Sequence, residues 1–215
     1  MDVLFDQRSL IFDGFRTTVL LTAASGALAL VFGTVLAIMR VCPVPPLRWA
    51  GATYVNLVRN TPLTLVFVIT VFGLPRLDIS FSFFNFAVLA LTAYTSTFVC
   101  EAVRSGINSV SSGEVEAARA IGLPFRQIMT LIVLPQALRA VIPPLGGLLI
   151  ALVKNSSIAA AFSVTEATQV ARRLSNSYGS ATLTILGGIA IGYLLITVCV
   201  SYGISWLERR TAPAR

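Results

Sequence analysis

Histidine is absent from this chain of 215 residues, and lysine occurs once, at position 154. Without histidine there is no Ser-His-Asp triad, no Cys-His pair and no histidine ligand for a metal. No GxxxxGK[ST] motif is present and Lys154 follows no glycine-rich turn, so the chain is not expected to hydrolyse ATP by itself. Cys42, Cys100 and Cys199 are too far apart to form a CxxC site. We therefore expect a protein that is not an enzyme and holds no cofactor and no metal.

Charge is also scarce, because charged residues make up 12% of the chain against about 25% in a typical soluble domain. Hydrophobic residues make up 56%, and the mean hydropathy is +0.84. The net charge is +7, from 16 basic and 9 acidic residues. A chain that binds nucleic acid gathers such charge on one polar face, whereas here the charges lie between long apolar runs. The composition therefore predicts an integral membrane protein in contact with lipid and no binding of nucleic acid.

Five apolar segments are long enough to cross a bilayer, which takes about 20 helical residues. The alternation of apolar and polar residues that is typical of a transmembrane barrel is absent. The sequence thus predicts an all-α, polytopic fold in one domain, residues 1–215, with spans at about 15–39, 54–74, 83–103, 137–161 and 183–207. Pro62 interrupts the second span early, and Pro143 and Pro144 lie inside the fourth, as a kink or as a site of close packing.

The distribution of basic residues predicts the orientation in the membrane. With five crossings the two termini lie on opposite sides, and the two sets of loops hold ten and six basic residues. The six are Arg8, Arg16, Arg76, Lys154, Arg172 and Arg173. The ten are Arg40, Arg48, Arg59, Arg104, Arg119, Arg126, Arg139, Arg209, Arg210 and Arg215. The richer set is expected in the cytoplasm, which places the N-terminus outside and the C-terminus in the cytoplasm.

The loop that follows the third span, residues 111–135, has strong helix signals. Ser111 stands three residues before Glu114, which is the spacing of a capping box at a helix start. Gly122 is placed as a C-terminal cap, and Pro124 stands where a further helix would begin. We expect a short helix, a tight turn and a second, amphipathic helix that leads into the fourth span.

The same loop resembles a known motif. Glu116-Ala117-Ala118, Gly122, Ile132 and Leu134-Pro135 are spaced as in the EAA loop of the permease subunits of binding-protein-dependent ABC importers. The resemblance implies a type I ABC importer permease fold, in which this loop is the coupling helix that docks in a groove of a cytoplasmic ATPase. The coupling residues would be Glu116, Ala117, Ala118, Gly122 and Pro135. The alternative is an ordinary helix-turn-helix at the membrane surface.

Four further segments resemble the polar amino-acid branch of that family, and within it the glutamate permeases of actinobacteria. They are GFRTTVLLT, VRNTPLTLV, AYTSTFVCEAVRSGINSV and GGLLIALVKNSSIA, which together cover most of residues 14–170. The resemblance implies a bacterial plasma membrane location and four kinds of partner. These are a cytoplasmic ABC ATPase dimer, a second permease subunit (identical or homologous), an extracellular substrate-binding protein and an amino-acid substrate.

Charged residues within apolar segments mark polar pathways or ion pairs. Glu101 and Arg104 are three residues apart, so they share a helix face, and we expect a structural salt bridge. Arg59, Asn60 and Thr61 stand together before Pro62. Arg59 is expected either to contact substrate or to extend to the lipid headgroups.

A second polar set follows the fourth apolar run. Lys154, Asn155 and Ser156 form a donor-rich turn that would bind the carboxylates of an amino acid, and Glu166 would pair with its ammonium group. In the alternative, Lys154 only anchors its helix at the outer headgroups.

The leading hypothesis is the transmembrane subunit of an ABC importer for a polar amino acid, with glutamate as the expected substrate. Glutamine, aspartate, arginine and cystine stay open, as does the choice between a homodimer and a heterodimer of permeases. One rival is an ATP-independent transporter or channel, which the lack of an inverted repeat disfavours. Another is a membrane-embedded enzyme, which the lack of histidine and of paired acids disfavours.

Overall fold

Residues 2–211 are described by a computed structural model, and within this range the chain is helical and contains no strand. The first half comprises α1 (Asp2–Asp6), α2 (Arg8–Val41), α3 (Pro45–Arg59), α4 (Leu63–Val68), the π-helical η1 (Ile69–Gly73), the 3-10 turn η2 (Leu74–Leu77) and α5 (Phe83–Asn108). The second half comprises α6 (Ser112–Ala120), α7 (Phe125–Gln127), the π-helical η3 (Ile128–Val133), α8 (Leu134–Asn155), the 3-10 segment η4 (Ser156–Phe162), α9 (Ala167–Ser177), η5 (Gly179–Ala181) and α10 (Thr182–Thr211). Arg215, one of the ten basic residues assigned to the cytoplasmic side, lies outside the described residues.

Four helical segments are long and apolar enough to cross a membrane: residues 8–41, 83–108, 125–162 and 179–211. The pair formed by Pro45–Arg59 and Leu63–Leu77 meets the same criteria together, although it is bent by 106°. These segments confirm the predicted all-helical, polytopic fold, with four continuous spans and one broken span.

The predicted second span, residues 54–74, is wrong as a continuous helix. Its first part begins earlier, because Pro45 and Pro46 occupy the first turn of α3, where a missing backbone N–H breaks no helical hydrogen bond. It ends at Arg59 because Pro62 disfavours a helical conformation of the residue before it. Pro62 then stands at the N-cap of α4. Arg59 to Pro62 thus form a break between two helices and do not open one.

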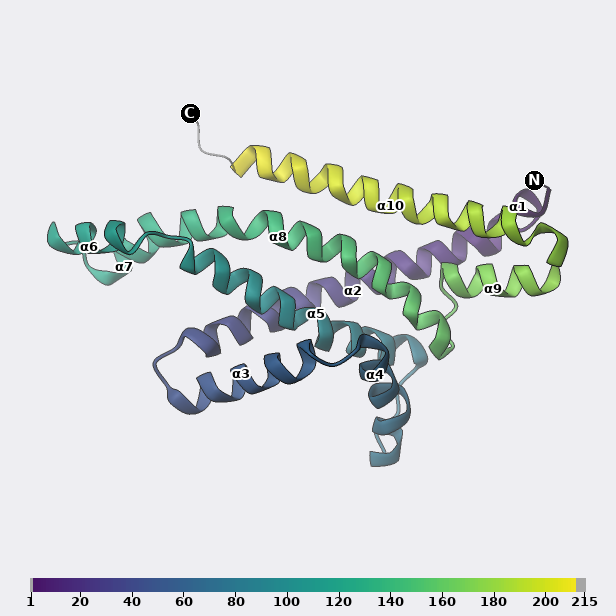
Figure 1. Ribbon diagram of the computed structural model, residues 1–215, viewed down its shortest axis with the longest axis horizontal. Helices are drawn as coiled ribbons and strands as arrows, with labels where there is room; N and C mark the ends of the chain where they lie inside the picture. Colours follow the sequence, from purple (N-terminus) through teal and green to yellow (C-terminus); the bar gives the residue numbers. More distant parts are fainter. Residues whose placement is uncertain (1, 212–215) are drawn as a thin grey trace.

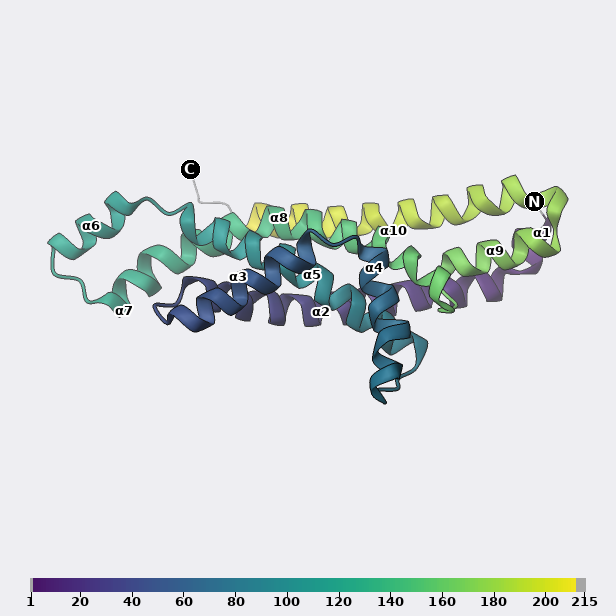
Figure 2. The same cartoon turned by 60° about the horizontal axis from the view of Figure 1, so that its bottom comes forward.

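The long helices lie lengthwise and the broken span turns away from them. Figure 1 shows α2, α5, α8 and α10 running along the long axis, while α4 points sideways out of the bundle. In Figures 1 and 2 the loop with α6 and α7 projects beyond one end of the bundle, toward which the C-terminal end of α10 also points. Helices α1 and α9 lie at the opposite end.

Small residues bring the spans into close contact. A Cβ atom on Gly33 of α2 would lie 2.5 Å from Val99 Cβ of α5, and one on Gly106 would lie 2.2 Å from Val141 Cγ2 of α8. Such contacts between helix backbones are how spans associate where the lipid is as apolar as the side chains. Pro143 and Pro144 lie inside α8, which continues through them.

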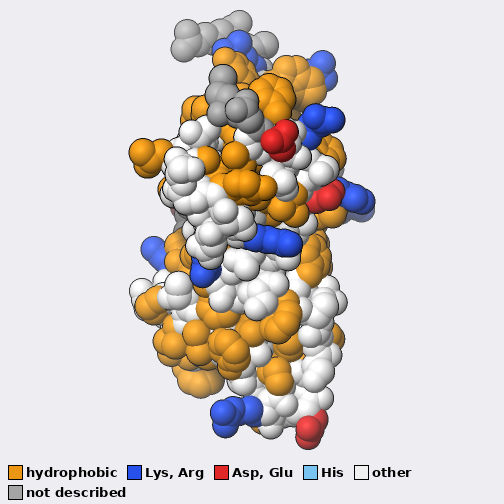
Figure 3. Space-filling model, turned by 90° about the vertical axis from the view of Figure 1, so that its right-hand side faces the viewer, with side chains coloured by type: hydrophobic (Ala, Val, Ile, Leu, Met, Phe, Trp, Pro, Cys, Tyr) orange, Lys and Arg blue, Asp and Glu red, His pale blue; other side chains and the backbone are white. Residues whose placement is uncertain are grey.

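The exposed surface is largely apolar. Figure 3 looks onto the end that carries α1 and α9, where patches of hydrophobic side chains alternate with uncharged areas and scattered charged side chains. The exposed large side chains come from several spans and include Leu20, Phe32, Leu89, Leu138, Leu194 and Trp206. This distribution is the one expected of helices that face hydrocarbon.

The contact at Gly33 gives a test of the packing. In Gly33→Ala the added methyl group would lie 2.5 Å from Val99 Cβ and 2.7 Å from the Ser96 carbonyl oxygen. Helices α2 and α5 must then separate, and overpacking of this kind costs about 1–3 kcal/mol. We expect a lower thermal unfolding temperature in detergent. The control is Gly203→Ala on α10, where nothing lies within 4 Å, and an equal loss in both variants would contradict the described crossing.

Candidate functional site: a projecting loop and an intramembrane cavity

The turn after α6 is a Schellman motif built on Gly122. The Gly122 N–H donates to the Arg119 carbonyl (2.9 Å), and the Leu123 N–H donates to the Ala118 carbonyl (3.1 Å). Gly122 has φ +82°, in the left-handed region that other L-residues rarely adopt. The predicted C-terminal cap is therefore confirmed, and α7 begins directly after Pro124, also as expected.

The start of α6 differs in its hydrogen bonds from the predicted capping box. Ser111 is at the N-cap position, but its side chain makes no capping hydrogen bond. Glu114 instead accepts a hydrogen bond from Nε2 of Gln136 in α8. The Glu114 carboxylate therefore joins the projecting loop to α8, the spanning helix that follows it.

The two alanines of the EAA motif differ in exposure, because they lie on different faces of α6. Ala118 is only 4% exposed and packs with Ile128 and Val133 in the small core of the loop. Its small size lets η3 of the same chain approach. Glu116 and Ala117 are exposed.

Two large apolar side chains at the tip of the loop were missed by the sequence reasoning. Ile121 is 77% exposed and Phe125 is 71% exposed, on either side of the Gly122 turn. Exposed apolar side chains rimmed by polar ones are typical of an interaction site. Ile121 and Phe125 stand next to a glycine cap and a proline in the sequence, and this position is the signal that could have identified them. Pro135 is partly buried in the first turn of α8, at the base of the loop.

Three arginines surround the carboxylate of Glu101 in α5. Arg104 lies 3.3 Å from Oε2, which confirms the predicted pair. Arg40, at the end of α2, donates to Oε1, and Arg59 lies 3.7 Å from the same oxygen. Pairing of this kind is what makes a carboxylate tolerable among apolar helices. The cluster joins α2, α3 and α5, and neither Arg40 nor Arg59 was expected in it.

A cavity of about 190 Å³ lies beside this cluster, between α5 and α8. Its lining includes Thr95, Phe98 and Asn155. The guanidinium carbon of Arg59 lies 5.8 Å from the centroid of the Phe98 ring. Asn155 thus lines the cavity itself, while Arg59 packs against the ring of a lining residue. Asn60 and Thr61 donate back to carbonyls of α3, at 2.8 Å each.

Lys154 and Ser156 do not line the cavity between α5 and α8. Lys154 is exposed and lines a separate cavity of about 330 Å³ together with Thr168 and Tyr193, between α8, α9 and α10. Ser156 is fully buried, and its hydroxyl donates to the Val153 carbonyl at 2.7 Å. The predicted donor-rich turn therefore does not form one surface.

Glu166 caps α9 from inside the protein. It is 0% exposed and accepts hydrogen bonds from the Gln169 N–H (3.0 Å), the Thr18 hydroxyl (3.2 Å) and the Tyr193 hydroxyl. The residue lies between the spanning helices, and burial raises the pKa of its carboxyl, against the lowering effect of these hydrogen bonds. In this structure Glu166 meets the chain's own donors and has no surface for a substrate's ammonium group.

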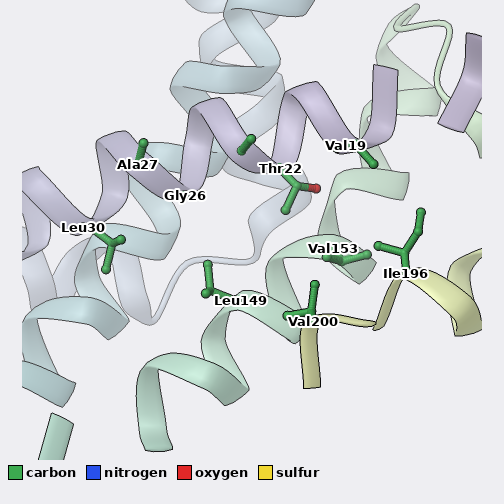
Figure 4. Close-up of a pocket in the computed structure, with 10 residues that line it drawn as sticks. Val19, Thr22, Gly26, Ala27, Leu30, Leu149, Val153, Ile196 and Val200 are labelled. Carbon is green, nitrogen blue, oxygen red and sulfur yellow. The ribbon is translucent and has the colours of Figure 1, made fainter. Parts of the chain in front are cut away.

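A further groove does not suit a polar solute. Figure 4 shows it between α2, α8 and α10, with Val19, Leu149, Val153 and Ile196 turned toward it. It has a volume of about 360 Å³, and its one hydroxyl, that of Thr22, already donates to the Thr18 carbonyl at 2.8 Å. A polar molecule placed here would lose its hydrogen bonds to water without replacement. Within residues 2–211 no group of three or more His, Cys, Asp or Glu side chains is placed to hold a metal ion.

The bundle of long apolar helices carries a helix-turn-helix that projects past one end (Figure 1). The family model for the inner membrane component of binding-protein-dependent transport systems matches residues 15–213. The chain belongs to this family, and it is therefore a transport subunit that crosses the membrane.

Relatives and solved structures agree with this assignment. The chain is 40% identical over 213 residues to the "Probable glutamine ABC transporter permease protein GlnM" of Bacillus subtilis, covering 98% of this chain and 97% of that protein. It is also 40% identical over 210 residues to the "Glutamate transport system permease protein GluC" of Corynebacterium glutamicum, covering 92% of each. A crystal structure of an amino acid ABC transporter with histidines matches with a TM-score of 0.90 at 27% identity, over 96% of both chains. These findings confirm the predicted family and permease fold.

The cap at Glu166 gives a second test. Glu166→Ala removes the acceptor of three donors and leaves the hydroxyls of Thr18 and Tyr193 with fewer partners. We expect a loss of about 3 kcal/mol in stability, measured by unfolding in detergent. Glu166→Gln keeps an acceptor oxygen of similar size and should lose clearly less. Equal stability of wild type and Glu166→Ala would contradict the capping role.

Proposed function

We propose that this chain imports a polar amino acid, with glutamate as the substrate, across the bacterial plasma membrane. It acts as the transmembrane subunit of an ABC importer and has no ATPase site of its own. The energy comes from ATP hydrolysed by a cytoplasmic ABC ATPase dimer. Relatives at 40% identity support both the mode of transport and the class of substrate, since one carries the name of a glutamine permease and another that of a glutamate permease.

The observation that carries the proposal is the exposed face of the projecting loop. Glu116 and Ala117 on α6 and Ile121 and Phe125 at the turn together present one acid, one small side chain and two apolar groups to an external partner. Desolvated apolar anchors with a charged neighbour are typical of a specific protein interface. We assign this face to the ATPase, with Gly122 fixing its turn, Ala118 its internal packing and Pro135 its junction with α8.

Substrate passes through the cavity between α5 and α8 in this proposal. The Asn155 amide and the Arg59 guanidinium offer hydrogen-bond donors to a carboxylate, and the tilted ring pair of Tyr94 and Phe98 provides apolar walls. Asn60 and Thr61 shape the helix break beside this route.

We assign other roles to the remaining predicted pathway residues, Lys154, Ser156 and Glu166. Lys154 lines a second, outer stage of the route beside α10. Ser156 and Glu166 act as positioning residues, since both are fully buried and bonded within the chain.

The proposed assembly also sets an orientation. The projecting loop and the end of α10 face the cytoplasm, and the N-terminus lies outside, in agreement with the excess of basic residues on the loop side. A second permease, identical or homologous, completes the membrane unit, and an extracellular binding protein delivers the substrate at the α1 and α9 end.

Uptake by reconstituted vesicles tests the function. The chain is co-expressed with its neighbouring ATPase and binding-protein subunits, purified as a complex and placed in liposomes loaded with ATP. We expect accumulation of radiolabelled glutamate that needs both ATP and the binding protein. Uptake of glutamine or arginine in its place would correct the substrate, and full uptake by the chain alone would favour an ATP-independent transporter.

The loop is tested at one exposed position. Ala117→Arg introduces a long charged side chain on the exposed face of α6, where it meets no neighbour in this chain. We expect normal thermal stability but a fall of at least about tenfold in substrate-stimulated ATPase activity, because a bulky charge at the centre of an interface is not accommodated. Ala117→Ser is the matched control and should keep that activity. Wild-type coupling in Ala117→Arg would show that the ATPase docks elsewhere.

A further inference from the structure

The cluster around Glu101 holds more positive charge than a structural ion pair needs. One carboxylate faces the guanidinium groups of Arg40, Arg59 and Arg104. Two arginines already pair with both of its oxygens, Arg40 with Oε1 and Arg104 with Oε2. The third, Arg59, shares an oxygen that is already occupied. An excess cation at membrane depth is costly unless it has a further use.

Arg59 is the least firmly held of the three. Its side chain is 48% exposed, against 12% for Arg40 and 28% for Arg104. Its distance of 3.7 Å from Oε1 is too long for a hydrogen bond. It is also the last residue of α3, directly before the 106° break to α4, whereas Arg104 lies inside the continuous helix α5. The contact between Arg59 and Glu101 is therefore the one that can open.

Arg59 is also the member of the cluster that packs against a wall of the cavity. Its guanidinium carbon lies 5.8 Å from the ring centroid of Phe98, which lines the cavity together with Asn155. The same guanidinium lies 3.7 Å from Glu101. Arg59 thus neighbours both a fixed carboxylate of the protein and a ring that borders the cavity in which a carboxylate of the substrate would arrive.

We propose that Glu101 is an internal counter-ion that competes with the carboxylate of the transported amino acid for Arg59. This inference rests on the proposed function, because it requires that an amino acid enters the cavity between α5 and α8. In the empty cavity Glu101 holds Arg59. An arriving carboxylate takes Arg59 over, while Glu101 stays paired with Arg40 and Arg104.

The exchange leaves Glu101 paired at every stage. Glu101 keeps two cationic partners when Arg59 leaves it, so its carboxylate does not become an unpaired charge among apolar helices. When Glu101 takes Arg59 back, the substrate loses a cationic partner and can move on. A transport site must bind its substrate strongly enough for the substrate to enter and weakly enough for it to leave. Competition from Glu101 for Arg59 weakens the binding and so allows the substrate to leave.

The test compares the apparent KM for glutamate uptake in variants of the full complex in proteoliposomes. Arg59→Gln removes the shared cation, and we expect KM to rise about tenfold, as for the loss of a charge-assisted hydrogen bond. Glu101→Gln removes the competing charge but keeps an acceptor for Arg40, and we expect KM to fall by about threefold to fivefold, the range of a partly exposed ion pair. Arg48→Gln, an exposed position near the start of α3, makes the same charge change away from the cavity and should leave KM unaltered.

The opposite signs are the decisive readout. A purely structural cluster would make both variants lose stability and uptake together, and KM changes of the same sign would overturn the proposal. If Glu101→Gln does not reach the membrane, Glu101→Asp is measured instead. It keeps the charge but draws it back from Arg59, and it should lower KM as well; an unchanged KM in Glu101→Asp would also overturn the exchange. Absence of glutamate uptake by the wild-type complex would refute the proposed function itself, which keeps the two failures distinct.

Discussion

Hydrocarbon offers no hydrogen bond to a polar group, and this constraint decides where the charged side chains of the spans lie. Glu101 sits among Arg40, Arg59 and Arg104, and Glu166 is enclosed by donors from α2, α9 and α10. Each carboxylate thereby ties together elements that are far apart in the chain. The same constraint leaves the outer faces of the spans to leucine, phenylalanine and valine.

Two departures from the regular bundle follow from particular residues. Pro62 separates α3 from α4 and leaves Arg59 at the free end of a helix, beside the cavity between α5 and α8. Gly122 reverses the chain after α6, so that Ile121 and Phe125 are exposed beyond the end of the bundle. Helices α5 and α8, which border the cavity, also flank the loop in the chain. The loop is therefore joined directly to both walls of the cavity.

The sequence predicted most of the features that depend on local signals, apart from the capping hydrogen bond of Ser111 and the bend in the second span. Apolar length located the spans, and the spacing of Glu116, Gly122 and Pro135 located the loop and its family. It predicted poorly what depends on contacts between distant segments. Arg40 and Arg59 could not be assigned to Glu101 without the packing of α2, α3 and α5. Lys154 stands near the end of α8 and Glu166 at the start of α9, yet Glu166 is fully buried and Lys154 is exposed. Helix periodicity alone does not distinguish these outcomes when a segment is apolar on every side.

The central claim is that ATP-driven motion reaches this chain through the exposed face of α6. The most direct test is a cryo-electron microscopy structure of the assembled transporter in lipid nanodiscs, with its ATPase and second permease present. The account predicts that Glu116, Ala117, Ile121 and Phe125 are buried against the ATPase, while Ala118 keeps its packing inside the loop. An ATPase bound to another surface, with this face of α6 open to solvent, would contradict the account.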